Sequence, residues 1–213
     1  MIQLTRRGIV SGKQEDLDSL RQQFDRNDYL ILPKLFETNL LEEIIQRVQA
    51  APFQPRDHHG IAVELCMDSP VTAALLNFLP SSPSFLKIIE RITGQSNLGQ
   101  FSGRVYQMNS SDGHYDSWHN DCFGGRAATM TVKLSPHVFE GGRLQLKRRD
   151  SDKILHEIHN TGLGDALIFR ISPELVHRVQ GVTGPNPKFA FAGWFLTGEE
   201  FLPNLGKRLS PGP

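Results

Sequence analysis

His119 and Asp121, a histidine and an aspartate with one residue between them, are the side chains whose types and spacing most strongly suggest chemistry. On a β-strand, residues two apart project from the same face, so this pair can supply adjacent corners of a coordination sphere. His177 lies in a run with strand character and can supply a third. Two histidines and one carboxylate with open positions are the facial arrangement that suits non-haem Fe(II). The pattern therefore indicates an iron site and oxidative chemistry.

A second pair of the same kind, His114 and Asp116, lies shortly before the first. The offset between the pairs is odd, so on one continuous strand they would point to opposite faces. We therefore expect at most one pair to face a given interior. For an isolated histidine, a surface position or a hydrogen-bonded core position is the simpler interpretation.

The C-terminal half of the chain reads as a series of short strands. From about residue 98 the apolar residues recur with a period of two, and glycine-rich turns become frequent. Strands are predicted at 101–108, 127–135, 143–148, 154–158, 166–170, 176–180 and 189–196.

The first 95 residues read instead as mainly helical, with one short strand at 29–33. Apolar residues recur at helical spacing over 17–24 and 40–48. Polar capping residues and prolines at the first helical position mark helix starts. The predicted starts are Thr38, Ser69-Pro70 and Ser82-Pro83, and Gly94 is the predicted end of the last helix.

Helices followed by a run of short strands predict a mainly β fold, a β-sandwich or open barrel backed on one face by helices. The 213 residues fit one sizeable domain, 1–213. Within it we expect a mainly helical support region at 12–95, a β core at 98–197 and an extended or frayed tail at 198–213. The segment 53–60 is rich in turn formers, and we expect a lid loop there, with His58 and His59 exposed to solvent.

A cation near the C-terminal end of the β core is a candidate ligand-binding residue. If 176–180 and 189–196 form a hairpin, Lys188 comes close to His177. Lys188, Ala190, Ala192 and Trp194 then share one strand face, and Phe189, Phe191 and Phe195 share the other. A cation beside two small residues leaves room for a bound carboxylate, whereas the phenylalanine face would be buried under the helices. The alternative is an exposed lysine on an edge strand.

Composition excludes several classes of function. Lys+Arg and Asp+Glu are 23 each and the isoelectric point is about 7.1, so no strong global field favours nucleic acid or anionic membrane as a partner. The N-terminus lacks the apolar core of a signal peptide, no long apolar window is present, and we expect a cytoplasmic protein. Cys66 and Cys122 are too few for a disulfide framework and are expected to be reduced, packed thiols. No pattern indicates an oligomeric state.

At this point the sequence resembles the Fe(II)- and 2-oxoglutarate-dependent dioxygenases, in particular their prolyl 4-hydroxylase-like branch and its bacterial PKHD-type hydroxylases. The likeness runs from about Arg104 to Phe195 and keeps the order of the family's motifs, which makes it far more specific than one histidine–aspartate pair. The matching segments are Tyr106, 113–121, 126–135, 141–146, 164–169, 177–179, 182–183 and 188–195.

The resemblance implies a fold, cofactors and site residues. The fold would be a double-stranded β-helix, or jelly roll, with 98–197 as the catalytic core. The cofactors would be Fe(II) and 2-oxoglutarate as cosubstrate, with ascorbate as a candidate reductant, and a C–H bond would be hydroxylated with release of succinate and CO₂. Matched residue by residue, the metal ligands and catalytic residues would be His119, Asp121 and His177, the anchor of the cosubstrate's far carboxylate Lys188, and a further cosubstrate contact Tyr106.

One departure bears on the cosubstrate. The family often has arginine, then any residue and serine, where this chain has Lys188 and Ala190, which removes a bidentate fork and a hydroxyl. Either the cosubstrate is bound more weakly, or Thr131 or Lys133 on an earlier strand compensates, because both can face inward.

Two other classes of function stay open. A zinc hydrolase could use the same three ligands with a metal-bound water, and a barrel of this kind could be a non-catalytic small-molecule-binding module. The substrate is open too, whether a small molecule or a peptide, since such a family fixes the cofactor and not the substrate.

Overall fold

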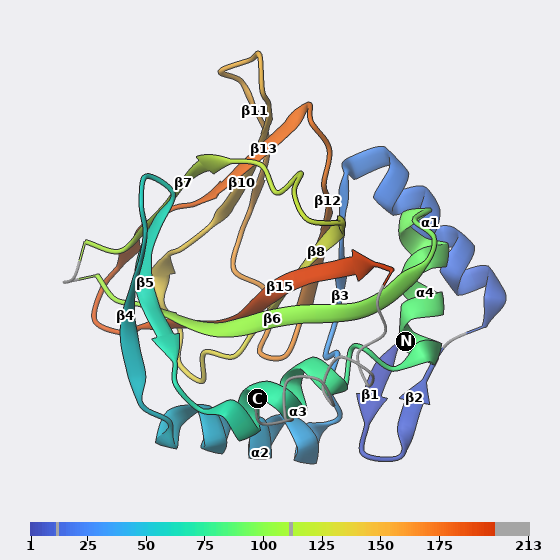
Figure 1. Ribbon diagram of the computed structural model, residues 1–213, viewed down its shortest axis with the longest axis horizontal. Helices are drawn as coiled ribbons and strands as arrows, with labels where there is room; N and C mark the ends of the chain where they lie inside the picture. Colours follow the sequence, from blue (N-terminus) through green and yellow to red (C-terminus); the bar gives the residue numbers. More distant parts are fainter. Residues whose placement is uncertain (12, 111–112, 199–213) are drawn as a thin grey trace, which may run out of the picture.

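The computed structural model describes residues 1–11, 13–110 and 113–198. The predicted tail, apart from Gly198, lies outside the described residues. Most of the described strands form one curled antiparallel sheet (Figure 1). Its order is β11-β10-β13-β7-β5-β6-β15-β8-β12-β3, with β4 added on β5. The bounds are β3 Tyr29–Leu32, β4 Phe53–His58, β5 Ala62–Met67, β6 Leu98–Met108, β7 Tyr115–His119, β8 Arg126–Lys133, β10 Leu144–Arg148, β11 Ile154–Ile158, β12 Ala166–Arg170, β13 Leu175–Val179 and β15 Lys188–Thr197.

The curl brings two walls of this sheet to face each other (Figure 1). The first wall, called here the large wall, consists of β6, β15, β8 and β12; the second, the small wall, consists of β7, β13 and β10. All seven strands predicted in the C-terminal half are present, each within a few residues of its predicted bounds. The mainly β fold with a jelly-roll arrangement is therefore confirmed.

Alternation along β15 follows the prediction. Phe191 and Phe195 are fully buried in the main hydrophobic core, while Ala192 and Trp194 line a cavity on the opposite face. Phe101 packs against both phenylalanines with ring centroids 5.3 Å and 4.9 Å away. The outer face of the large wall thus holds the core, and its inner face is left for the cavity.

The predicted hairpin between 176–180 and 189–196 is wrong. β13 pairs with β10 and β7 in the small wall, whereas β15 pairs with β6 and β8 in the large wall. Between them, β14 (Val182–Thr183) pairs with β9 (Glu140–Gly141) in a separate two-stranded ladder. The connecting chain therefore crosses from one wall to the other and does not form a hairpin turn. A turn sequence rich in glycine and proline does not distinguish a hairpin from such a crossing.

Four helices lie against the outer side of the sheet: α1 Gln14–Asn27, α2 Thr38–Ala50, α3 Pro70–Phe78 and α4 Pro83–Thr93 (Figure 1). α3 and α4 begin with proline after a serine, as predicted, although neither serine side chain caps its helix with a hydrogen bond. Gly94 ends α4 in the left-handed conformation, with φ 72°, as its position predicted. Apolar residues of α4, among them Ile89 and Ile92, are fully buried in the core beneath β6 and β15.

The region 12–95 also contains strands that the helical pattern did not predict. β3 was predicted and pairs with β12. The loop predicted at 53–60 is instead strand β4, which forms a hairpin with β5. This strand was not predicted because Pro55 lacks the N–H that a central strand needs. Proline is tolerated in an edge strand, and among the described strands β4 pairs only with β5. A small hairpin of β1 (Gln3–Thr5) and β2 (Gly8–Val10) was not predicted either.

Two smaller expectations have clear outcomes. His58 and His59 are exposed, as expected. Both cysteines are free, but Cys122 is exposed rather than packed, because the chain around it forms a surface loop. None of the helices in the described ranges combines the length and apolar character needed to cross a membrane.

Candidate active site

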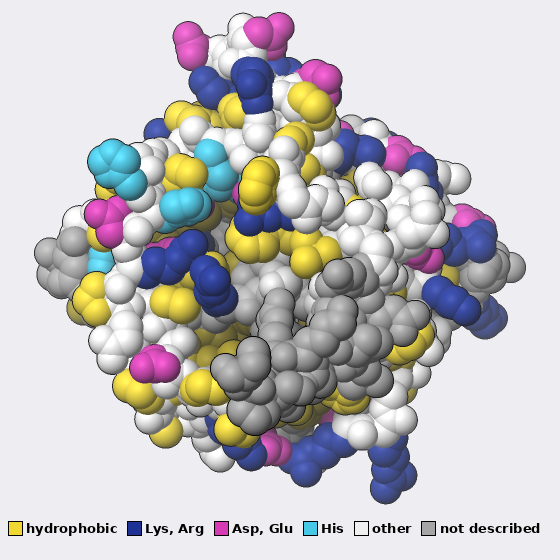
Figure 2. Space-filling view, in the orientation of Figure 1, with side chains coloured by type: hydrophobic (Ala, Val, Ile, Leu, Met, Phe, Trp, Pro, Cys, Tyr) yellow, Lys and Arg dark blue, Asp and Glu magenta, His cyan; other side chains and the backbone are white. Residues whose placement is uncertain are grey.

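A cavity of about 580 Å³ lies between the two walls. Figure 2 shows dark blue Lys and Arg side chains and cyan His side chains grouped beside the hollow in this face of the molecule. This volume falls within the range of small-molecule sites. The polar residues that line the cavity are Arg56, His58, Glu64, Arg104, Tyr106, Asp116, His119, Asn120, Asp121, Arg126, Thr129, Thr131, His177, Lys188 and Trp194.

The structure brings His119, Asp121 and His177 together in this cavity. His119 ends β7 and is the direct cross-strand partner of His177 on β13, while Asp121 follows in the loop after β7. One ligand atom from each lies within 4.8 Å of the others. The Asp121 carboxylate is 3.8 Å from His119 Nε2 and 3.5 Å from His177 Nε2. This cluster of nitrogen and carboxylate donors, set on one side of an open cavity, fits a divalent transition metal.

The protonation pattern suits metal binding as well. His119 Nδ1 lies 2.7 Å from the Ser117 carbonyl, which can only accept, so Nδ1 donates and the lone pair of Nε2 faces Asp121. His177 has 8% of its surface exposed, and burial lowers its pKa to about 4. It is therefore neutral near pH 7, the form in which imidazole binds a metal.

Of the second histidine–aspartate pair, His114 and Asp116, only the aspartate lines the cavity. His114 is buried, its Nδ1 accepts the N–H of Asn109 at 2.8 Å, and it does not line the cavity. Asp116 does line it, 3.3 Å from His119 Nδ1. The expectation that parity would keep Asp116 and His119 on opposite faces is wrong because β7 is bulged: β13 advances from His177 to Val179 while β7 spans one residue more.

Lys188 approaches the same cavity from the start of β15. Its Nζ donates to the Gly142 carbonyl at 2.8 Å. Burial lowers its pKa to about 8, against the opposing effect of the Asp116 and Glu64 carboxylates. Most of the ammonium is thus charged near pH 7, inside a pocket where a carboxylate partner would be strongly held.

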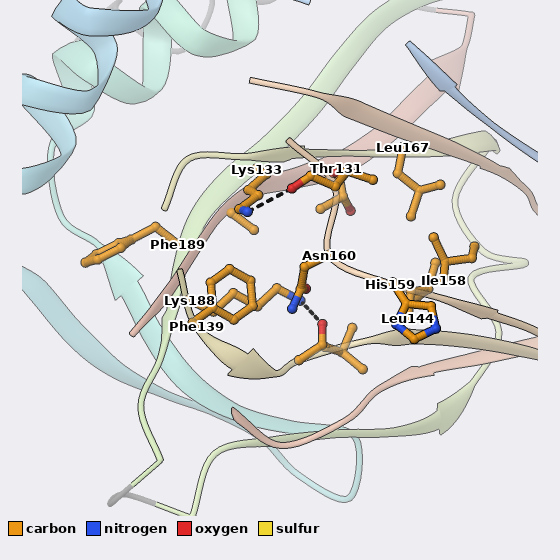
Figure 3. A pocket seen from close by; sticks show the side chains of 14 residues that line it. Thr131, Lys133, Phe139, Leu144, Ile158, His159, Asn160, Leu167, Lys188 and Phe189 are labelled. Carbon is orange, nitrogen blue, oxygen red and sulfur yellow. Dashed lines mark hydrogen bonds between the residues drawn. The ribbon is translucent and has the colours of Figure 1, made fainter. Parts of the chain in front are cut away.

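The other residues implied for the cosubstrate separate into two groups. Tyr106 lines the cavity, and burial raises the pKa of its phenol to about 12. Thr131 lines both this cavity and a smaller one of about 60 Å³ behind it. Lys133 belongs to the smaller cavity, where its Nζ donates to the Thr161 carbonyl at 2.8 Å (Figure 3). Figure 3 also shows Lys188, which lines both spaces.

Sequence reasoning missed several residues of the cavity. Arg126 Nη1 donates to Asp121 Oδ1 at 3.0 Å, and its guanidinium lies 3.6 Å from the centre of the Trp194 ring. On the opposite side, Arg56 pairs with Glu64 at 2.7 Å. The Arg56–Glu64 pair comes from the β4–β5 hairpin, and a strand was not predicted for β4, so nothing in the sequence indicated that it faces the site.

Buried polar atoms without partners concentrate at this cavity. Within the described ranges, four buried side-chain atoms have no hydrogen bond, and three of them belong to cavity-lining residues: Asp116 Oδ1, Thr129 Oγ1 and Trp194 Nε1. Native proteins pair nearly all such groups, so an unpaired cluster points to a site shaped for an occupant.

The comparisons agree with this geometry. Residues 103–196 match the model of the 2OG-Fe(II) oxygenase superfamily. A prolyl-4-hydroxylase from Pseudomonas putida superposes with a TM-score of 0.65 at 17% identity, covering 85% of this chain and 99% of that one. A prolyl hydroxylase from Trichoplax adhaerens, solved with a hypoxia inducible factor peptide fragment, gives 0.62 at 18%, covering 95% and 99%. A 2OG-Fe(II) oxygenase family protein from Burkholderia pseudomallei gives 0.65 at 14%, covering 94% and 98%.

No curated protein sequence matches the chain. The solved structures establish the fold, which is that of the prolyl 4-hydroxylase-like oxygenases, and the matched model covers the strands that carry His119, His177 and Lys188. Residues 103–196 thus form a 2OG-Fe(II) oxygenase domain.

Proposed function

We propose that the protein hydroxylates a C–H bond of its substrate, converting 2-oxoglutarate to succinate and CO₂, with Fe(II) held by His119, Asp121 and His177. The observation that carries this proposal is the cluster of these three side chains within 4.8 Å, in one cavity with the buried cation Lys188. A zinc hydrolase would instead need a positioned general base for its metal-bound water, and it would need no anchor for an oxo acid. Residues 98–197 act in this proposal as the catalytic core, supported by 12–95.

Bound Fe(II) with 2-oxoglutarate supplies the oxidation of the C–H bond by O₂. The protein holds the ligands in place. Arg126 donates to Asp121 Oδ1, which leaves Oδ2 on the His177 side as the oxygen directed to the metal. The Ser117 carbonyl fixes the His119 ring by accepting a hydrogen bond from Nδ1–H.

Lys188 would bind the far carboxylate of 2-oxoglutarate. Its ammonium is held by one backbone carbonyl, at Gly142, and retains further donors for a carboxylate. The neighbouring small side chains of Ala190 and Ala192 leave the space free on the large wall. Tyr106 and Thr131 line the space near Lys188 and are proposed as further cosubstrate contacts; Lys133 is less suited, because its ammonium is directed to Thr161 in the smaller cavity.

Anaerobic titration tests this assignment directly. Adding Fe(II) and then 2-oxoglutarate to the purified protein should produce a visible charge-transfer absorption band, and admitting O₂ should yield succinate. Zn(II) in place of Fe(II) should give neither. Hydrolysis of ester or amide probes supported by Zn(II), with no band under Fe(II), would instead establish the hydrolase. Ligand binding without succinate would establish the binding module. Repeating the aerobic reaction with and without ascorbate tests its role as reductant.

The substrate is a small molecule or a peptide in this proposal. The structural neighbours include proteins named as prolyl hydroxylases and an epimerase, SnoN, from nogalamycin biosynthesis. Mass spectrometry of peptide pools and cell extracts, searching for the gain of one oxygen that depends on 2-oxoglutarate, identifies it.

A further inference from the structure

An exposed arginine without a partner faces the outer part of the cavity. Arg104 lies on the inner face of β6, beside Ala192 of β15, and lines the cavity. No hydrogen bond or ion pair joins its side chain to any residue in the described ranges. It is also distant from the proposed cosubstrate anchor. The strand partner of Lys188 is Met108, four residues along β6, which corresponds to roughly 13 Å.

A second arginine on this inner face has donors to spare. The Arg126 side chain makes one hydrogen bond among the described residues, to Asp121. Its other guanidinium N–H groups donate to none of the described residues, and the side chain is 25% exposed. If Asp121 binds a metal, its negative charge is shared between the metal and Arg126. The carboxylate then balances less of the positive charge of Arg126.

The charges that line the cavity do not balance. Four cations, Arg56, Arg104, Arg126 and Lys188, face three carboxylates, Glu64, Asp116 and Asp121. A divalent cation and the dianion 2-oxoglutarate together add no net charge, so the excess of positive charge persists in the loaded site. Arg56 is neutralised by Glu64 at 2.7 Å and Arg126 by Asp121 at 3.0 Å, so the excess lies with Arg104 and with Lys188, the proposed cosubstrate anchor.

Apolar side chains accompany these two arginines. Phe123 lines the cavity although 78% of its surface is exposed, and the Arg126 guanidinium lies 5.9 Å from its ring centre. Ile61, in the turn between β4 and β5, lines the cavity as well. An exposed aromatic ring at the edge of a pocket is typical of a ligand-binding surface.

We propose that the substrate is a small organic anion, whose carboxylate or phosphate is bound by Arg104 with the help of Arg126 and whose apolar body lies against Phe123. The identification of this anion as the substrate rests on the proposed function; the anion site itself does not. A guanidinium can donate two parallel hydrogen bonds to a carboxylate or a phosphate. Because Arg104 is exposed, an anion can contact it on entering the cavity.

The test uses phenylacetate and its neutral amide, phenylacetamide, as probes. Ligand-observed NMR titration of the metal-free protein should show tighter binding of phenylacetate. Arg104→Gln should lower the affinity for phenylacetate about five- to tenfold and leave the affinity for phenylacetamide unchanged. This is the effect expected for one charge-assisted contact that is weakened by solvent at an exposed site. Arg104→Glu should reverse the preference, so that phenethylamine binds better than phenylacetate. Phenyl phosphate, titrated in parallel, distinguishes a phosphate from a carboxylate preference.

Two controls locate the bound anion. Arg47→Gln, on the exposed face of α2, removes the same charge far from the cavity and should change nothing. With Mn(II) and saturating 2-oxoglutarate present, the paramagnetic ion should broaden the phenylacetate signals of the wild type.

Equal binding of the acid and the amide, binding of neither, or loss of phenylacetate binding in Lys188→Ala but not in Arg104→Gln would overturn the proposal. None of these outcomes depends on succinate formation, so a failed oxygenase assay and a failed anion site are distinguishable.

Discussion

The two walls of the cavity differ in regularity. In the large wall, β15 keeps register with β8 and β6 over most of its length, and every second side chain faces the cavity while the alternate ones enter the core. In the small wall, β7 is bulged opposite β13, and the chain leaves the strand just before Asp121. The regular wall can therefore pack and hold a cosubstrate, whereas the irregular one brings Asp116, His119 and Asp121 to the same cavity.

The largest effect should come from the irregular wall. His177→Ala and His119→Ala each remove one of three ligands, so we expect both to abolish iron binding and succinate formation. Metal content per folded protein and succinate yield are the measurements. His114→Ala serves as the control and should retain iron; loss of iron in that variant, with retention in His119→Ala, would move the site to His114 and Asp116.

The core face of the regular wall should affect stability and not chemistry. Phe191 is fully buried between Phe101 and the helices, so Phe191→Ala should lower the free energy of unfolding by about 3–5 kcal/mol through the lost burial and the cavity left behind. Urea unfolding measures the change. Folded Phe191→Ala protein should still bind iron, and a selective loss of iron at full stability would show that the two faces of β15 are not independent.

The cavity face of the same wall should affect the cosubstrate. Lys188→Ala should weaken 2-oxoglutarate binding by about 10- to 150-fold, the equivalent of roughly 1.5–3 kcal/mol for a charge-assisted hydrogen bond in a partly buried site. Iron content should stay normal. Lys133→Ala is the matched comparison and should have a small effect, because that ammonium contacts Thr161. The opposite ranking of the two variants would move the anchor to β8.

The smallest effect is a pH dependence. The pKa of Lys188 is lowered by burial to about 8, so the ammonium is present below that pH and lost above it. Cosubstrate affinity should then be constant below about pH 8 in the metal-loaded protein and fall by up to about tenfold per pH unit above it. Lys188→Arg keeps its charge over this range and should flatten the profile. A profile unchanged by that substitution would assign the titration to another group.

This difference between the walls also explains what could be predicted from the sequence. Alternation in β15 was enough to assign Phe191 to the core and Ala192 to the cavity, because a period of two survives wherever the strand is regular. The inward position of Asp116 could not be derived, since one extra residue in β7 reverses the parity. His177 and Lys188 were expected in one hairpin, and they share a cavity for a different reason, the crossing of the chain between the walls.

Long-range pairing set a similar limit in the N-terminal region. The serine–proline pairs at the start of α3 and α4 are local signals, and they located both helices. β4 has no such signal: its residues prefer turns, and only its pairing with β5 makes it a strand. The position of Arg56 and Glu64 at the cavity therefore could not be predicted from the sequence.

The position of β4 at the edge of the curled sheet has one further consequence. An edge strand with unpaired backbone groups can recruit a strand from another molecule and so begin aggregation. Pro55 interrupts the row of donors along this edge, and Arg56 and Asp57 place charges beside it. These features disfavour intermolecular strand addition along an edge whose residues Arg56 and His58 also line the cavity.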